Sequence, residues 1–160
     1  MLNISIICVG KLKEKYWSLA VLEYLKRLKA FCKCTTVEID EKKVSANPSD
    51  FEIKEAICTE GKRILSKIPN NSYVISMCIE GKELSSEQFA KKIEEIPLNG
   101  KSSIAIIIGG SWGLSGDVKE RSDFKLSISR MTFPHQMARV IVLEQVYRAF
   151  QILSDGKYHK

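Results

Sequence analysis

The architecture follows from two segments, SIAIIIGGSWGLSG at residues 103–116 and FKLSISRMTFPHQMARVIVLEQVYRAFQ at residues 124–151. Five apolar residues, Ile104–Ile108, run into Gly109-Gly110, which is typical of a strand that is buried on both faces and ends where the backbone turns or lets a ligand approach. Phe124–Ile128 predicts a shorter strand, followed by a loop and then a long helix. We expect the two loops to leave neighbouring strand ends, where open α/β sheets bind ligands.

The rest of the chain predicts alternating strands and helices in one domain, residues 1–160. The expected strands are 3–9, 35–39 and 72–79, the last closed by Glu80-Gly81-Lys82. The expected helices are 14–31, one that begins at Ser49 or Asp50, one from Ser85 that ends before Pro97, and one from His135 to about Leu153. This alternation predicts an α/β fold with a mostly parallel sheet and helices on both faces.

Composition excludes several classes of protein. With 44% hydrophobic and 28% charged residues among 160, the chain is expected to be globular, and no apolar run approaches the roughly 20 residues that span a bilayer. Five cysteines, an odd number, argue against a disulfide framework and favour the cytoplasm, and Cys32 and Cys34 lack the further ligands that a metal site needs. We therefore expect no membrane and no metal.

The charge of the chain is compatible with an acidic partner. The formal net charge is +6, and the segment Lys11–Lys33 holds seven Lys or Arg residues against two Glu. This segment is either a solvated helix face or a surface that contacts RNA phosphates, and the charge by itself leaves both interpretations open.

The last helix is apolar around most of its circumference. A surface helix buries one face, so this pattern predicts either a central position or a subunit interface. In a domain of this size we favour the interface and predict a homodimer.

His135 is the candidate for acid–base chemistry. It follows Pro134 at the start of the last helix, where unpaired N–H groups favour a neutral imidazole that can accept or relay a proton. A structural capping or core histidine is the alternative. The segment GGSWGL does not fit the dinucleotide pattern G-x-G-x-x-G, which leaves a nucleotide-dependent oxidoreductase as a weak hypothesis.

Several motifs together resemble one family. IIIGGSWGL, LSISRMTFPHQMAR, EQVYRAF and the final YHK closely resemble the RlmH family of SPOUT-class methyltransferases, as do VGKLKEKYW near the start and ISMCIEGK in the middle. Enzymes of this family methylate N3 of a pseudouridine in helix 69 of 23S ribosomal RNA. The resemblance implies a trefoil knot within about residues 103–160, although knots are rare in proteins.

The resemblance also implies which residues form the site. The cofactor S-adenosylmethionine would contact residues at the third strand, the glycine loop and the next loop, namely Met77, Gly109, Ile128, Ser129, Arg130, Met131, Thr132 and Phe133. Backbone groups around Ser129 and Met131 would bond the adenine edge. The catalytic candidates are His135, Arg139 (for a phosphate or for charge on the base), Tyr158 and His159. The tail with Tyr158 and His159 is expected to enter the partner subunit's pocket.

The implied substrate is the assembled ribosome, since the chain has no separate RNA-binding domain. Two other functions stay open: a SPOUT enzyme that acts on another RNA, such as transfer RNA, and a non-catalytic ribosome-binding factor.

Overall fold

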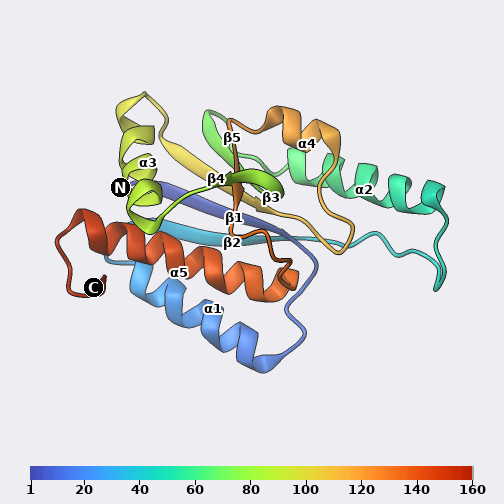
Figure 1. Cartoon of the computed structure of the whole chain (residues 1–160), viewed down its shortest axis with the longest axis horizontal. Helices are drawn as coiled ribbons and strands as arrows, with labels where there is room; N and C mark the ends of the chain where they lie inside the picture. Colours follow the sequence, from blue (N-terminus) through green and yellow to red (C-terminus); the bar gives the residue numbers. More distant parts are fainter. Residues whose placement is uncertain (160) are drawn as a thin grey trace.

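The computed structural model describes residues 1–159 and contains one sheet of five parallel strands. The strands are β1 (Asn3–Val9), β2 (Lys33–Ile39), β3 (Ser72–Glu83), β4 (Ser103–Ile108) and β5 (Phe124–Ser127). Their order across the sheet is β2-β1-β4-β3-β5 (Figure 1). The α/β fold with a parallel sheet is therefore confirmed. Because every strand runs the same way, the carboxyl ends of all five meet at one edge.

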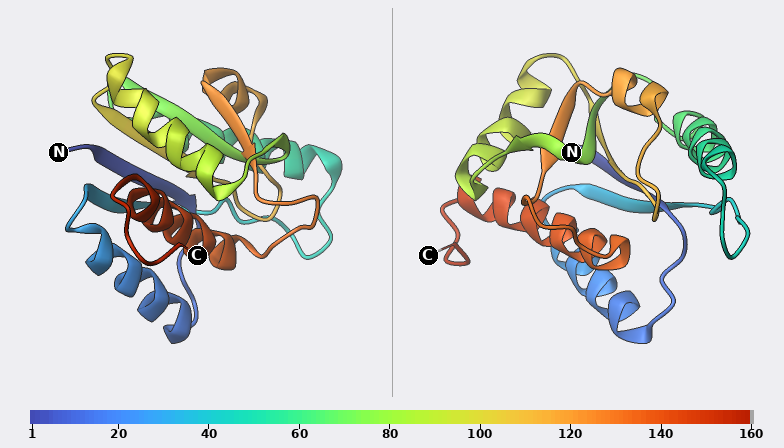
Figure 2. Two further views of the ribbon diagram at one scale, coloured as in Figure 1. Left: turned by 60° about the vertical axis from the view of Figure 1, so that its left-hand side comes forward. Right: turned by 45° about the vertical axis from the view of Figure 1, so that its right-hand side comes forward.

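Helices cover both faces of this sheet (Figure 2). They are α1 (Lys15–Leu28), α2 (Asp50–Leu65), α3 (Ser86–Leu98), α4 (Gly116–Arg121) and α5 (His135–Leu153). α5 packs between α1 and α3 on one face, and α2 and α4 cover the other. In β1, Ile4 and Ile6 point to the first layer while Ile7 and Val9 point to the second. This two-residue alternation in a strand that is apolar throughout is the reason that both faces are buried.

Several predicted boundaries agree with the structure and others do not. β1 and α5 have the predicted bounds, and Ser49 caps α2 with a reciprocal capping box that includes Glu52. Two predictions were wrong, and one helix was missed. Pro97 lies inside the last turn of α3, where it removes one helical N–H donor, and the helix ends one residue later at Leu98. The short helix α4 was not foreseen, and β3 lies between β4 and β5, so their ends are not neighbours.

β3 also continues past the turn that was predicted at Glu80-Gly81-Lys82. It runs to Glu83 and pairs with β5 on both sides of a register shift between Met77 and Lys82. A Cβ atom on Gly81 would lie 2.7 Å from the Leu126 carbonyl carbon. The glycine thus lets the two backbones come together, and it does not mark a turn.

Gly81→Ala is expected to destabilise the protein because the new methyl group meets the β5 backbone, which cannot rotate away as a side chain would. We expect the free energy of unfolding to fall by about 1–3 kcal/mol in urea denaturation. Gly116→Ala is the matched control, since its Cβ meets nothing within 4 Å and its backbone is helical. Equal stability of the two variants would contradict the account of Gly81.

The central position of α5 explains its apolar circumference within a single chain. Leu153, at 38% exposed, is the most exposed residue of the helix. Of the two interpretations made from the sequence, the central position is thus observed, and the subunit interface stays a prediction. Among residues 1–159, none of the helices combines the length and apolar character that crossing a bilayer requires.

Candidate active site

A cavity of about 600 Å³ opens at the carboxyl edge of the sheet. Its walls come from residues 77–80 of β3, the loop after β4, the end of β5 with the loop that follows it, and the first turn of α5. Although β3 separates β4 from β5, the loops after β4 and β5 reach the same cavity because parallel strands run toward the same edge, and residues 77–80 of β3 lie between them. The volume is in the range of small-molecule and cofactor sites.

The glycine loop after β4 is shaped by contacts within itself. Gly113 has a φ of +83° and its N–H donates to the Gly110 carbonyl over 3.1 Å. A Cβ atom on Gly109 would lie 3.0 Å from the Gly113 carbonyl carbon. Gly109 was predicted to let the backbone approach a cofactor, and it does line the cavity. Glycine is also needed there for a second reason, because the loop folds back on itself and leaves little room for a Cβ atom.

Seven of the eight predicted cofactor residues line this cavity. They are Met77, Gly109, Ile128, Ser129, Met131, Thr132 and Phe133. The exception is Arg130, whose side chain is 97% exposed and lies 3.9 Å from Glu83. Its neighbours Ser129 and Met131 line the cavity, although Met131 is itself 73% exposed at the mouth of the site.

Hydrogen bonds within the loop after β5 fix its shape. The Ser127 hydroxyl donates to the Ser129 carbonyl over 2.9 Å, and the Met131 amide donates to the Ser129 hydroxyl over 3.1 Å. Two of the backbone groups that were expected to bond an adenine edge therefore already have partners. The Ser129 carbonyl retains a second lone pair, whereas the Met131 N–H is occupied.

An ion pair that the sequence did not reveal stands at the wall of the cavity. Lys119 of α4 and Glu80 of β3 approach to 2.5 Å between Nζ and Oε1. Their hydrogen bond raises the pKa of Lys119 and lowers the pKa of Glu80. Because both side chains are partly exposed, the pair adds little stability. The two residues belong to separate elements, and their contact could not be predicted because α4 was not predicted.

His135 lies on the cavity wall at the first position of α5. Burial lowers its pKa, and the nearby charges of Arg139 and Lys13 lower it further, against an opposing effect of Glu41. The direction agrees with the prediction, but burial, not the helix N-terminus, is the main cause. At neutral pH the imidazole is uncharged and able to accept a proton.

Arg139, the candidate for holding a phosphate or for stabilising charge on the base, is buried. Its side chain is 1% exposed, and it donates to Glu38 Oε1 over 2.9 Å and to the Gly10 carbonyl over 3.0 Å. The spacing from His135 places it on the inner face of α5, toward β1 and β2. A guanidinium held in this way cannot reach a substrate unless these contacts break.

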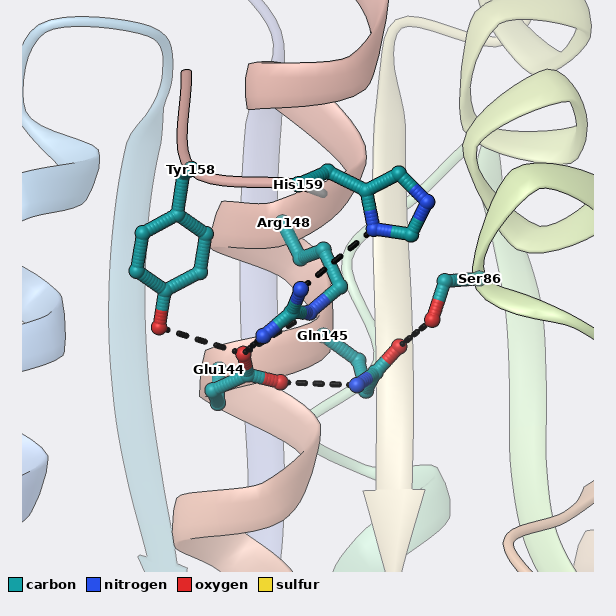
Figure 3. A network of polar contacts seen from close by, with 6 residues as sticks. All are labelled: Ser86, Glu144, Gln145, Arg148, Tyr158 and His159. Atoms are coloured by element: carbon teal, nitrogen blue, oxygen red, sulfur yellow. Dashed lines mark hydrogen bonds and ion pairs between the residues drawn. The ribbon is translucent and has the colours of Figure 1, made fainter. Parts of the chain in front are cut away.

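The two tail candidates are not among the residues that line the cavity of their own chain. They lie beside Glu144 and Arg148 of α5 (Figure 3). The Tyr158 hydroxyl donates to Glu144 Oε1 over 3.2 Å, and the Arg148 guanidinium lies over its ring. His159 Nε2 is 2.8 Å from Glu87 Oε1. The tail thus packs on α3 and α5, and the structure does not bring Tyr158 or His159 to His135. Lys160 lies outside the described residues.

Comparisons with known proteins agree on one family. A family model described as "Predicted SPOUT methyltransferase" matches residues 2–159. The chain is 52% identical over 159 residues to the ribosomal RNA large subunit methyltransferase H of Clostridioides difficile, covering 99% of this chain and 100% of that protein. It is 50% identical, over the same shares, to the protein of that name from Clostridium novyi and to a putative one from Methanococcus maripaludis.

A solved structure supports the fold. A probable methylase family protein from Haemophilus influenzae Rd KW20 superposes with a TM-score of 0.52 at 14% identity, covering 99% of this chain and 70% of that one. At this identity the likeness shows the fold alone. Together with the full-length matches above, it means that this chain belongs to the SPOUT methyltransferase family, in the group of the ribosomal RNA large subunit methyltransferase H proteins.

Proposed function

We propose that this protein transfers a methyl group from S-adenosylmethionine to N3 of a pseudouridine in helix 69 of 23S ribosomal RNA, in the assembled ribosome. The observation that carries the proposal is the full-length identity of about half to relatives named as large-subunit ribosomal RNA methyltransferases. The cavity that seven motif residues line supplies a place for the cofactor.

The cavity fits the proposed cofactor in size and chemistry. Met77, Leu126 and Phe133 supply apolar walls for an adenine ring, and the backbone of the loops supplies polar groups. When bound, the cofactor supplies an electrophilic methyl group on a sulfonium. The Lys119 ammonium on the wall is neutralised by Glu80, so it would not repel that positive charge.

The residues of the chain would act by position and by proton transfer. The cavity walls hold the nucleophile and the methyl donor in line and exclude water. His135, uncharged at neutral pH, accepts or relays the proton that N3 of the base must lose. This role is supported by its position on the cavity wall, next to the loop that would contact the cofactor.

A homodimer would complete each site. Tyr158 and His159 lie on their own α5 and α3, and neither lines the cavity that contains His135. In the proposed dimer they enter the partner subunit's cavity, where the Tyr158 ring stacks on the target base. The whole chain acts as one domain, with a knotted part at about residues 103–160, and works in the cytoplasm.

The basic residues of the segment Lys11–Lys33 would contact the ribosomal RNA. All seven are exposed: Lys11, Lys13, Lys15, Lys26, Arg27, Lys29 and Lys33. The Lys13 amide donates to Gln136 over 2.9 Å, which holds one end of this surface beside the first turn of α5. An RNA strand whose phosphates bind this basic surface would pass close to the cavity, because the first turn of α5 lines that cavity.

The test is transfer of labelled methyl groups from S-adenosylmethionine to ribosomes that lack the modification, beside free subunits, deproteinised RNA and transfer RNA. We expect label in large-subunit RNA only, strongest in assembled ribosomes, and mapped to N3 of one pseudouridine. Label in transfer RNA alone would establish another RNA substrate. Ribosome binding without any transfer would favour a non-catalytic binding factor.

A further inference from the structure

The buried guanidinium of Arg139 joins three elements next to His135. Its two terminal nitrogens donate to Glu38 on β2 and to the carbonyl of Gly10, which follows β1. Its Nε atom is buried without a partner in the described residues. The guanidinium therefore has one carboxylate to balance its charge, and Glu38 is that carboxylate.

The loop between β1 and α1 is tied to the first turns of α5 at two points. One is the Arg139 bond to the Gly10 carbonyl, and the other is the bond from the Lys13 amide to Gln136. His135 lies beside both of these contacts on α5. Gly10 has a φ of +85°, and a Cβ atom on it would lie 3.7 Å from His135 Nε2. The backbone at Gly10 thus forms one side of the space that the imidazole occupies.

Glu38 fixes the direction in which the guanidinium points. Glu38 on β2 lies opposite Cys8 on β1, and Cys8 is two residues before Gly10 in the chain. The Glu38 side chain is 39% exposed. Without this carboxylate a buried positive charge would have only a neutral carbonyl acceptor. Such a charge is costly to keep buried, so the side chain would rearrange toward solvent and release Gly10.

We propose that Glu38 is a positioning residue, which holds Arg139 on the Gly10 carbonyl and thereby sets the place of the His135 imidazole at the cavity. The inference rests on the proposed function, in which His135 handles the proton of the target base. It gives Arg139 a positioning role in place of the predicted contact with a phosphate or with the charge on the base. Glu38 itself lies outside the set of residues that line the cavity.

Glu38→Gln tests this inference because it removes the charge and keeps the shape. We expect kcat for methyl transfer to fall about 10-fold or more, since small displacements of a catalytic group are costly, with KM for the cofactor changed less than about twofold. Glu38→Asp should recover part of the loss. Asp40→Asn is the control: it makes the same charge change near the end of β2, and its carboxylate has no bonding partner among residues 1–159.

A double-mutant cycle separates positioning from a general loss of stability. If Glu38 acts through His135, Glu38→Gln should cost little further kcat in a His135→Ala background. Additive losses would overturn the inference. An independent readout is the NMR signal of the imidazoles, since the chain has just two histidines. Glu38→Gln should move the His135 resonances and leave those of His159 in place.

The two experiments also keep this inference distinct from the proposed function. Unmoved His135 resonances together with additive kinetics would reject the role of Glu38 while methyl transfer stands. Absence of methyl transfer by the unmodified protein would reject the proposed function. In that case the NMR comparison would still decide whether Glu38 positions the imidazole.

Discussion

Replacing His135 by alanine is expected to lower kcat for methyl transfer by about 100-fold or more, within the usual contribution of acid–base catalysis. The imidazole lies on the cavity wall, and burial lowers its pKa, so in the folded protein it is the neutral, proton-accepting form at pH 7. Cofactor affinity, measured by calorimetry on the same variant, should change little because the proposed cofactor contacts come mainly from Met77 of β3 and from the loops after β4 and β5.

The pH dependence of the unmodified protein provides a second readout of the same prediction. A base must be unprotonated, so kcat/KM should fall as the pH drops below the pKa of His135. Because that pKa is lowered from its ordinary value of roughly 6.5, the fall should begin below about pH 6.5, and this limb should be absent in His135→Ala.

His135→Gln distinguishes a proton acceptor from a group that only orients the base. Glutamine retains hydrogen bonding but cannot take up a proton near neutral pH. Loss of activity in both variants supports proton transfer, whereas an active glutamine variant would reduce His135 to an orienting role. Full activity of His135→Ala would remove the residue from the mechanism.

Local patterns account for the part of the fold that the sequence predicted correctly. The apolar run of β1 and the long apolar pattern after Pro134 can be identified from the local sequence alone, without knowing what they pack against. Both elements have the predicted bounds. The cavity residues after β4 and β5 were likewise placed by contiguous motifs. Gly81 misled the prediction because a glycine looks the same in a turn and where two backbones pack closely.

Contacts between distant segments account for what the sequence could not show. Arg139 was predicted to contact a phosphate or to stabilise charge on the base, and no local pattern indicated its partners Glu38 and Gly10, which lie 101 and 129 positions away in the chain. A buried arginine and a substrate-binding one have the same local pattern, and only the packing of α5 on β1 and β2 separates them. The ion pair of Lys119 and Glu80 was missed for the same reason.

Removal of Tyr158–Lys160 is the second change for which we expect a large effect. Activity should fall by about 100-fold or more, because the proposed site loses its stacking ring and a second imidazole at the reacting base. Thermal stability should change little, since the tail contacts Glu144 and Tyr147 on α5 and Glu87 on α3, and none of these is among the buried residues of the two core clusters. A large drop in the melting temperature would instead show that the tail is a structural element of its own subunit.

Mixed dimers test whether the tail acts in its own subunit or in the partner's. One subunit would carry His135→Ala and the other the tail deletion, so each is inactive alone. If sites are shared, every mixed dimer has one site with both an intact His135 and an intact tail. A random one-to-one mixture would then recover about a quarter of the unmodified activity, because half of the dimers are mixed and each has one good site.

No recovery, in a mixture shown by mass spectrometry to contain mixed dimers, would mean that the tail acts within its own chain. The contacts to Glu144 and Glu87 would then have to break during each turnover.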